Sequence, residues 1–272
     1  MTHRAPSWDP ERYLRHQAPR LRPVHDLLAR VPDPPHPHPR VADLGCGPGG
    51  PSLPLLERWP TAHVTGYDSS PAMLGRAAPY AGGTPEGGRI DFRRADLQHW
   101  HPDGEQLLFS NAALQWVTPE DGPGHHRLLP RWLEALPPGG VLAFQVPGNH
   151  EAPSHALLNR LRRSPRWREL LGPPREPAVL DPAGYHRLLA PLAREVDAWE
   201  TTYLHLLQGP DPVLDWISGT GLRPVLDRLE GEPEAREEFL DSYAALLREA
   251  YPATEAGTYF PFRRIFVVAV RR

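Results

Sequence analysis

Residues 40–50 read Arg-Val-Ala-Asp-Leu-Gly-Cys-Gly-Pro-Gly-Gly, an apolar run that leads directly into a glycine cluster. We expect a strand over 40–44 and a helix over 52–58, so the glycines should form a strand-to-helix loop. Gly45 and Gly47 can adopt backbone angles closed to other residues, and their lack of side chains lets a ligand approach the main chain at the start of a helix. The stretch therefore predicts a nucleotide-type binding loop.

The acid at the end of this strand indicates which ligand the loop takes. Gly45, Gly47 and Gly50 also satisfy the dinucleotide pattern G-x-G-x-x-G, so the glycines alone leave a nicotinamide cofactor and S-adenosylmethionine open. Asp43 lies two residues before Gly45, where a carboxylate can meet an ammonium group but would repel a pyrophosphate. We therefore expect S-adenosylmethionine as the cofactor; the alternative is a loop that is only a tight turn.

Two further acids follow expected strands. Asp68 comes after a strand over 62–67, at close to the roughly 20-residue separation of a ribose-binding acid, and should accept hydrogen bonds from both ribose hydroxyls. Its alternative role is to cap the helix that follows it. Asp96 comes after a strand over 89–94, where it could take the exocyclic amine of adenine or only cap a turn.

Strands and helices alternate in the first part of the chain, and then the pattern changes. The expected strands are 40–44, 62–67, 89–94, 106–110 and 141–146, and the helices between them are 52–58, 71–79 and 125–136. Such alternation predicts a parallel sheet whose ligands bind outside the carboxyl ends of the strands, so Asn111 and Gln115 should face the reaction region. Residues 150–190 and 210–250 read as helices around a strand near 193–204, and an apolar strand closes the chain.

We therefore predict an α/β fold, a Rossmann-like seven-stranded and mostly parallel sheet with helices on both faces, an N-terminal helical lid and helical cap insertions. The expected divisions are a lid with a proline-rich linker (1–39), a cofactor-binding core (40–149), a cap or substrate region (150–258) and a closing strand (259–272).

Composition narrows the function classes. The 272 residues carry a formal net charge of −3, which disfavours nucleic acids and anionic membranes as partners. All 30 basic residues are arginine, so no lysine chemistry is available. Cys46 is the single cysteine, so we expect no disulfide, no multi-cysteine metal site and a reducing compartment. No signal peptide or apolar span is evident, which predicts a cytoplasmic protein; monomer and homodimer both stay open.

The N-terminal segment is a candidate lid. Between Trp8 and Arg30 we expect two short helices separated at Pro19 and Pro23. Such a segment just before the cofactor loop can fold over a ligand, and Tyr13, Arg20 and Arg22 could line it. The alternative is an amphipathic helix that packs on the sheet.

Four motifs together resemble the class I S-adenosylmethionine-dependent methyltransferases. They are Asp43-Leu-Gly-Cys-Gly-Pro-Gly49, Asp68-Ser-Ser-Pro-Ala-Met-Leu74, Ala95-Asp-Leu-Gln-His-Trp100 and Ser110-Asn-Ala-Ala-Leu-Gln-Trp116. Further motifs resemble a branch of that family that methylates small polycarboxylic acids such as trans-aconitate. These are Trp8-Asp-Pro10, Arg20-Leu-Arg-Pro23, Gln145-Val-Pro-Gly-Asn149, Ala152-Pro-Ser-His155, Ser164-Pro-Arg-Trp167, Trp199-Glu-Thr-Thr-Tyr203, Gly219-Thr-Gly-Leu-Arg-Pro224 and Phe260-Pro-Phe-Arg-Arg-Ile-Phe266.

The resemblance implies methyl transfer from S-adenosylmethionine to a carboxylate of a small polycarboxylate, with no catalytic base and no metal. It implies a cofactor site of Asp43, Gly45, Cys46, Gly47, Asp68, Ser69, Met73, Asp96, Leu97, Asn111 and Ala112, with Tyr13 and Arg20 from the lid. It implies a substrate site of Arg22, Gln115, Trp116, His155, Tyr203, Arg223, Tyr259, Arg263 and Arg264. Arginine suits such a substrate because its guanidinium matches a carboxylate through two parallel hydrogen bonds.

Two departures and three alternatives stay open. The segment 117–126 is longer than the resemblance leads us to expect, and Gln106 stands where aspartate is expected. The alternatives are a methyltransferase for another small carboxylate or a malonyl-acyl-carrier thioester, a non-catalytic S-adenosylmethionine-binding protein, and a nicotinamide oxidoreductase, against which Asp43 argues.

Overall fold

The computed structural model describes residues 17–118, 122, 124–174 and 178–272, and the chain divides into two compact units. The sheet unit comprises Gln17–Gly148, Pro177–Thr201 and Arg264–Arg272. The described residues of the helical unit are 149–174 and 202–263. Each unit is described below by itself.

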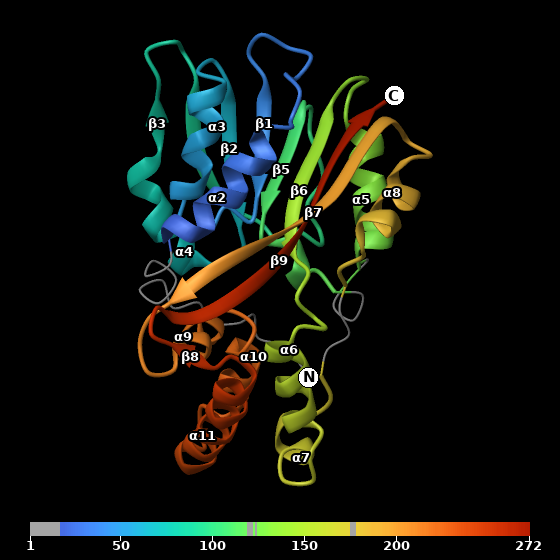
Figure 1. Ribbon diagram of the computed structural model, residues 1–272. Coiled ribbons are helices and arrows are strands. Elements are labelled where there is room, and N and C mark those ends of the chain that lie inside the picture. The colour runs from blue at the N-terminus through green and yellow to red at the C-terminus, as the bar shows by residue number, and fades with distance from the viewer. Residues whose placement is uncertain (1–16, 119–121, 123, 175–177) are drawn as a thin grey trace. The chain divides into compact units, whose positions relative to one another are not determined.

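A mixed sheet of nine strands runs through the described residues in the order β3-β4-β2-β1-β5-β6-β9-β7, with β8 paired to β9 (Figure 1). The strands are β1 (Arg40–Leu44), β2 (His63–Asp68), β3 (Gly82–Gly83), β4 (Arg89–Arg94), β5 (Leu107–Asn111), β6 (Val141–Pro147), β7 (Ala193–Leu207), β8 (Ala253–Thr254) and β9 (Gly257–Arg271). Because β3 and β8 have only two residues each, seven longer strands remain, as the sequence predicts.

The first five long strands are parallel, and the closing strand is not. Parallel pairs join β4 to β2, β2 to β1, β1 to β5 and β5 to β6, whereas β9 runs antiparallel to β6. β1 therefore lies inside the sheet, with Asp43 between Gly66 of β2 and Phe109 of β5. The carboxyl ends of β1, β2 and β5 meet at one edge, where ligands bind in open α/β sheets.

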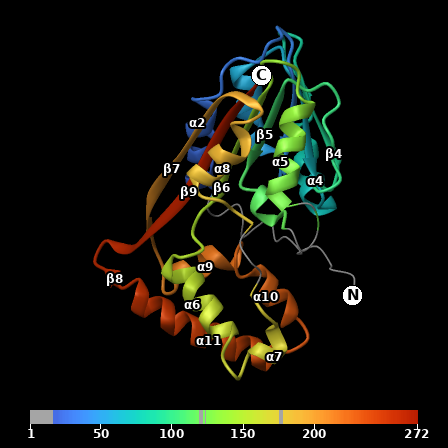
Figure 2. The same cartoon turned by 90° about the vertical axis from the view of Figure 1, so that its right-hand side faces the viewer.

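Helices cover both faces of the sheet unit (Figures 1 and 2). They are α2 (Gln17–Leu28), α3 (Leu53–Arg58), α4 (Pro71–Ala77), α5 (Gly124–Ala135) and α8 (Pro182–Leu189), with short 3-10 turns at Gly50–Ser52, Ala78–Tyr80 and Leu114–Trp116. Strands β1, β5 and β6 are almost continuously buried, as expected for parallel strands covered on both sides. Trp132, Phe144 and Tyr185 fill the core between β6, α5 and α8.

Of the two short helices expected between Trp8 and Arg30, the first lies outside the described residues, and α2 corrects the expected breaks at Pro19 and Pro23. It runs unbroken through Pro23, and Pro19 lies in its first turn. A proline in the first turn removes no intrahelical hydrogen bond, because those N–H groups have no partner in the helix. Pro23 does remove one, and full burial of Val24 and Leu27 in the core offsets that loss.

The helical unit has an apolar core of its own. Its helices are α6 (Pro153–Arg162), α7 (Arg168–Leu171), α9 (Pro212–Ser218), α10 (Arg223–Arg228) and α11 (Pro233–Ala250). Trp216, Phe239 and Phe260 are almost completely buried between them. Tyr243 of α11 donates a 2.6 Å hydrogen bond to the Ser154 carbonyl, which fixes α11 against the start of α6.

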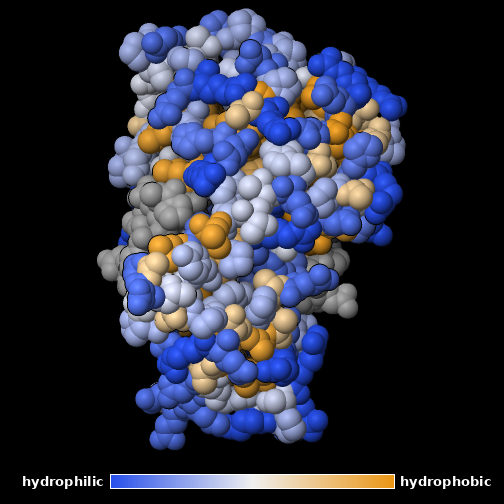
Figure 3. Space-filling view, viewed as in Figure 1, coloured by the Kyte–Doolittle hydropathy of each residue, from blue (hydrophilic) through white to orange (hydrophobic). Residues whose placement is uncertain are grey.

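No helix among the described residues is both long and apolar enough to cross a membrane. The face in Figure 3 is largely hydrophilic, and its apolar side chains form small separate patches.

Candidate functional site

The glycine loop after β1 turns the chain with three left-handed residues, Gly45 at φ 81°, Gly47 at φ 56° and Gly49 at φ 83°. The N–H groups of Gly45 and Cys46 both donate to the Tyr67 carbonyl, at 2.8 and 3.0 Å, which ties the loop to β2. A β-carbon at Gly47 would meet no atom within 4 Å. The loop therefore has fixed backbone and open space beside it, as a main-chain ligand site requires.

Two carboxylates flank this loop, the buried Asp43 and the half-buried Asp68. Asp43 is 3% exposed, and one of its oxygens accepts a 2.5 Å hydrogen bond from Ser52 Oγ. Burial raises the pKa of Asp43 from 3.8 to about 7; the Ser52 hydrogen bond opposes that rise, and the nearby Asp68 carboxylate adds to it. Burial raises the pKa of both Asp43 and Asp68, so a cation beside these carboxylates would stabilise their ionised forms.

Asp68 stabilises the loop and the next helix at once. Its Oδ2 accepts from the Gly47 N–H at 3.0 Å and its Oδ1 from the Ser70 N–H at 2.8 Å. Ser70 itself caps α4, because its Oγ accepts from the Met73 N–H at 3.4 Å. Each carboxylate oxygen has a second lone pair, so both the ribose role and the turn role are compatible with this geometry.

Asp96 and Leu97 lie after β4 and differ in exposure. Asp96 is exposed, and its Oδ1 accepts from the Gln98 N–H at 3.0 Å, which is the turn-capping alternative. Its Oδ2 also lies 3.3 Å from His99 Nδ1. Leu97 is half-buried and reaches within 3.9 Å of the β-carbon position of Gly45, so it borders the glycine loop. The contact between Asp96 and adenine stays a prediction.

The residue directly after β5 has a strained backbone conformation. Ala112 has φ 55°, a conformation that non-glycine residues rarely adopt and that often marks functional sites. Its N–H donates to the Gln145 carbonyl at 2.9 Å, and its own carbonyl accepts from Gln115 Nε2 at 2.6 Å. Asn111 Oδ1 accepts from Gln145 Nε2.

The remaining predicted residues of the sheet unit are more scattered. Met73 of α4 is buried, Ser69 is exposed after β2, and Trp116 is half-buried beside Gln115. Arg22 is exposed on α2, 3.9 Å from Asp26. Arg20 belongs to the same helix, and Tyr13 lies outside the described residues. Arg264 is only 5% exposed and donates to Gln145 Oε1 at 3.0 Å.

In the helical unit, the structure gathers a cationic and imidazole-rich group. The rings of His150 and His155 pack edge to face with centroids 6.0 Å apart. The positive charge of Arg263 lowers the pKa of His150. The Asn149 amide holds Arg263 by its backbone, accepting from its N–H at 2.8 Å and donating to its carbonyl at 2.9 Å. His155 Nε2 lies 3.2 Å from the β-carbon position of Gly221.

Burial lowers the pKa of both imidazoles. The pKa of His155 falls from 6.5 to about 4, chiefly through desolvation and secondly through His150. The pKa of His150 is lowered by burial and by the Arg263 charge. His150 Nε2 is buried without a hydrogen-bond partner among the described residues. Arg223 begins α10 and lies 3.4 Å from Asp227, with a side chain 17% exposed.

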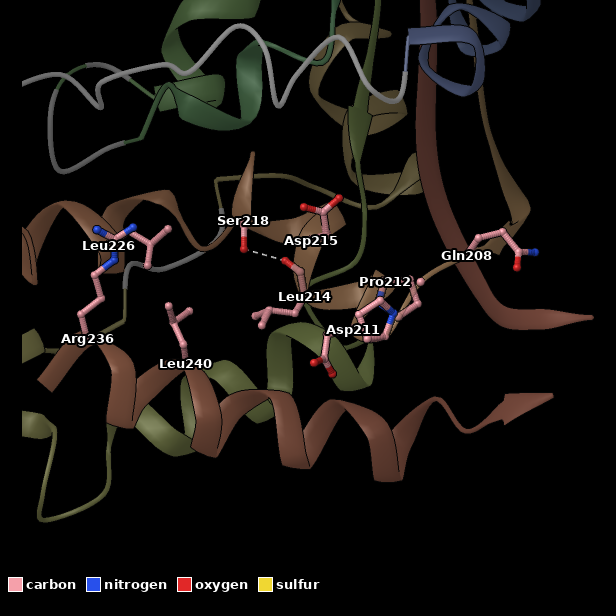
Figure 4. A pocket seen from close by; sticks show the side chains of 11 residues that line it. Gln208, Asp211, Pro212, Leu214, Asp215, Ser218, Leu226, Arg236 and Leu240 are labelled. Atoms are coloured by element: carbon pink, nitrogen blue, oxygen red, sulfur yellow. Dashed lines mark hydrogen bonds between the residues drawn. The ribbon is translucent and has the colours of Figure 1, made fainter. Parts of the chain in front are cut away.

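Other parts of the helical unit lie apart from this group. Tyr203 is buried in β7, and Tyr259 of β9 is 47% exposed. A cavity of about 440 Å³ opens between the loop after β7, α9 and α11 (Figure 4). Asp211 on its wall is already held by Arg248 at 2.7 and 2.8 Å. None of the predicted site residues lines this cavity.

Sequence reasoning missed four side chains at these places: Ser52, Gln145, Asn149 and His150. Ser52 was expected only as the start of a helix, yet it binds the Asp43 carboxylate. Gln145 and Asn149 stood inside a quoted motif, and their bonds to Arg264 and Arg263 depend on β9 pairing beside β6. For Gln145 and Asn149, the only signal in the sequence was that their motif lies at the end of an expected strand.

Comparison with known proteins agrees with this geometry. A methyltransferase domain family matches residues 41–140, which contain the glycine loop and all three acids. In fold, the chain is similar to the YcgJ protein from Bacillus subtilis, with a TM-score of 0.54 at 14% identity over 94% of this chain and 99% of that protein. At that identity the likeness concerns the fold alone.

Two curated relatives align with nearly the whole chain. Trans-aconitate 2-methyltransferase from Streptomyces coelicolor is 58% identical over 97% of this chain and 87% of that protein. The enzyme of the same name from Streptomyces avermitilis is 56% identical over 97% of both. The chain therefore belongs to the trans-aconitate 2-methyltransferase family of S-adenosylmethionine-dependent methyltransferases.

Proposed function

We propose that this chain transfers a methyl group from S-adenosylmethionine to a carboxylate oxygen of trans-aconitate. The products are the monomethyl ester and S-adenosylhomocysteine. The name of the relatives supports the acid, and their identity over 97% of the chain supports carrying it over. The observation that carries the proposal is the pair of the buried Asp43 and the half-buried Asp68 beside the open glycine loop.

The residues around the loop suit S-adenosylmethionine. That cofactor supplies a methyl group on a positively charged sulfur, and its amino acid tail carries an ammonium. Asp43 would hold the ammonium, and a cation there removes the cost of ionising a carboxylate whose pKa burial raises to about 7. Asp68 would accept from the ribose, and the open side of Gly47 would let the ligand approach the main chain.

The acid needs no general base. A carboxylate is ionised at neutral pH, so its oxygen can attack the methyl carbon directly while the carbon–sulfur bond breaks and sulfur keeps the electron pair. What the protein must supply is alignment, and well-oriented encounters can lower a barrier by roughly 7–11 kcal/mol. The shortage of exposed bases near the loop is therefore no objection.

The helical unit would supply the groups that hold the other carboxylates. Arg223 and Arg263 are the cations, and His155 and His150 are imidazoles that can donate to an anion. Tyr203, Tyr259 and Trp116 stay candidates for the walls of the substrate site.

The test is turnover by the purified chain. With S-adenosylmethionine and trans-aconitate, we expect S-adenosylhomocysteine and a singly methylated acid, both measured by mass spectrometry. Citrate and a malonyl thioester serve as competing acceptors. Turnover of the thioester without any of trans-aconitate would contradict the proposal, and donor binding without methyl transfer to any acid would favour the non-catalytic alternative.

A further inference from the structure

Three side chains from neighbouring strands of the sheet unit form one hydrogen-bonded line. Arg264 of β9 donates to Gln145 Oε1 at 3.0 Å, and Gln145 Nε2 donates to Asn111 Oδ1. The register explains the line: Asn111 pairs with Gln145, and Gln145 pairs with Phe266, two residues from Arg264. Side chains at paired and diagonal positions share one face of a sheet and can touch.

The chemistry of the three groups permits only one orientation. A guanidinium has donors and no acceptor, so the Gln145 amide must present its oxygen to Arg264. Its nitrogen then faces Asn111, which must present its own oxygen in return. Reversing either amide would oppose two donors in a site where Gln145 is fully buried. The charge on Arg264 thereby fixes the direction of the Asn111 amide.

We propose that Arg264 and Gln145 are positioning residues that hold Asn111 Nδ2 as a donor for a ligand carboxylate at the end of β5. Asn111 Nδ2 has no hydrogen-bond partner among the described residues, although its oxygen is bound. The adjacent Ala112 is held in its left-handed conformation by the backbone of the same Gln145. If the carboxylate belongs to the acid substrate, this inference rests on the proposed function.

A carboxylate suits this site because Asn111 Nδ2 is the last group of a hydrogen-bonded chain that begins at the Arg264 cation. Hydrogen-bonded groups in series polarise one another, which strengthens the last N–H toward an anion. Two sources offer that group, the amino acid tail of the methyl donor and the acid substrate. Arg264 and Gln145 are 5% and 0% exposed, whereas Asn111 is half-buried and is the member of the line most open to a ligand.

Two substitutions separate orientation from bulk. Asn111→Asp keeps an acceptor for Gln145 but has no donor for the ligand. Gln145→Glu keeps an acceptor for Arg264 but can only accept, so Asn111 must turn its nitrogen inward and offer oxygen to the ligand. Gln106→Glu is the matched control, because it adds the same charge before the opposite end of β5, where Gln106 binds the Arg40 N–H and the Gly104 carbonyl.

We expect both variants to weaken binding of the carboxylate ligand about tenfold or more, which is the usual effect of a lost hydrogen bond to a charged group. Two measurements separate the possible carboxylates. In the donor arm, calorimetry with S-adenosylhomocysteine measures binding of the methyl donor's amino acid tail; in the acid arm, the KM for trans-aconitate measures binding of the substrate. A loss of affinity confined to one arm shows which carboxylate Asn111 binds. Gln106→Glu should match the unaltered protein in both arms, although it lowers Tm by losing the hydrogen bond to the Gly104 carbonyl.

Unchanged affinity of both variants in both arms would overturn the inference, as would loss in Asn111→Asp with none in Gln145→Glu. If Gln145→Glu does not fold, the Asn111 side-chain amide resonance of the unaltered protein, assigned by its absence in Asn111→Asp, gives the answer. It should shift when ligand binds, and no shift with either ligand refutes the proposal. If trans-aconitate is not methylated at all, the proposed function fails while the donor arm still tests the line.

Discussion

Gly45 and Ala113 lie so close that a β-carbon at position 45 would come within 2.1 Å of the Ala113 methyl carbon. The two residues follow β1 and β5, which pair directly in the sheet. Their approach brings the glycine loop against the corner at Ala112. Gly47, two residues later in the same loop, has open space where its side chain would be.

This contrast predicts different defects for two alanine substitutions. Gly45→Ala should destabilise the protein, because the new methyl has to displace the Ala113 backbone or the loop. Gly47→Ala should cost only about 1–2 kcal/mol for its left-handed angle, yet weaken donor binding at least tenfold by filling the open space. Tm and calorimetric Kd measure the two effects, and equal Tm losses with equal Kd values would contradict the distinction.

A second prediction concerns the buried acid. Asp43→Asn removes a charge but keeps an acceptor for Ser52 Oγ. The rise of the Asp43 pKa from 3.8 to about 7 corresponds to roughly 4 kcal/mol of free energy at pH 8, the upper limit of what the ligand-free variant should gain in stability. The same variant should bind the donor more weakly. Lower stability at pH 8 together with unchanged affinity would refute this assignment.

The sign of the pH dependence follows from the same pKa. Since the folded protein keeps the Asp43 proton to a higher pH than the unfolded chain, its contribution to stability is present below pH 4 and is lost as pH rises toward 7. Donor affinity runs the other way, because the cation needs the ionised form. We expect affinity to rise up to about pH 7 and then level off, and Asp43→Asn to flatten that profile in calorimetry.

The strands, the glycine loop and the acids could be predicted because each depends on local sequence. Asp43, Gly45 and Asp68 follow directly from the apolar runs that end in them. The unbroken α2 could not be predicted, because burial of Val24 overrides what Pro23 indicates locally. Tertiary burial decides that element, and a single sequence does not display it.

The hydrogen bond between Gln145 and Arg264 could not be predicted either, because it also depends on tertiary structure. Gln145 meets Arg264 only because β9, which comes last in the chain, inserts antiparallel beside β6. Arg264 was predicted to bind the substrate, and that role stays a prediction; in the structure its guanidinium donates to the buried Gln145. Whether it also influences the acid is what the Gln145→Glu variant measures.

A third prediction tests the cations of the helical unit. Arg223→Ala should raise the KM for trans-aconitate about tenfold or more and leave donor Kd nearly unchanged, because its guanidinium is assigned to the acid alone. Arg248→Ala is the control, since that exposed arginine pairs with Asp211 on the cavity wall. Equal effects of Arg223→Ala on donor and acid would contradict a carboxylate clamp.

The last prediction concerns acid stability. His155 is neutral in the folded protein above about pH 4 but gains a proton below 6.5 once unfolded, so its contribution to stability is present above 6.5 and is lost as pH falls toward 4. The full difference is roughly 3 kcal/mol. His155→Gln should therefore reduce the loss of unfolding free energy between pH 6.5 and 4, followed by tryptophan fluorescence. His63→Gln, at an exposed position of β2, is the matched control for the substitution itself. The buried His125, whose pKa is also lowered, keeps part of the pH dependence of the unfolding free energy in every variant. We therefore expect a smaller slope in His155→Gln rather than a flat profile. An unaltered slope in His155→Gln would contradict the prediction.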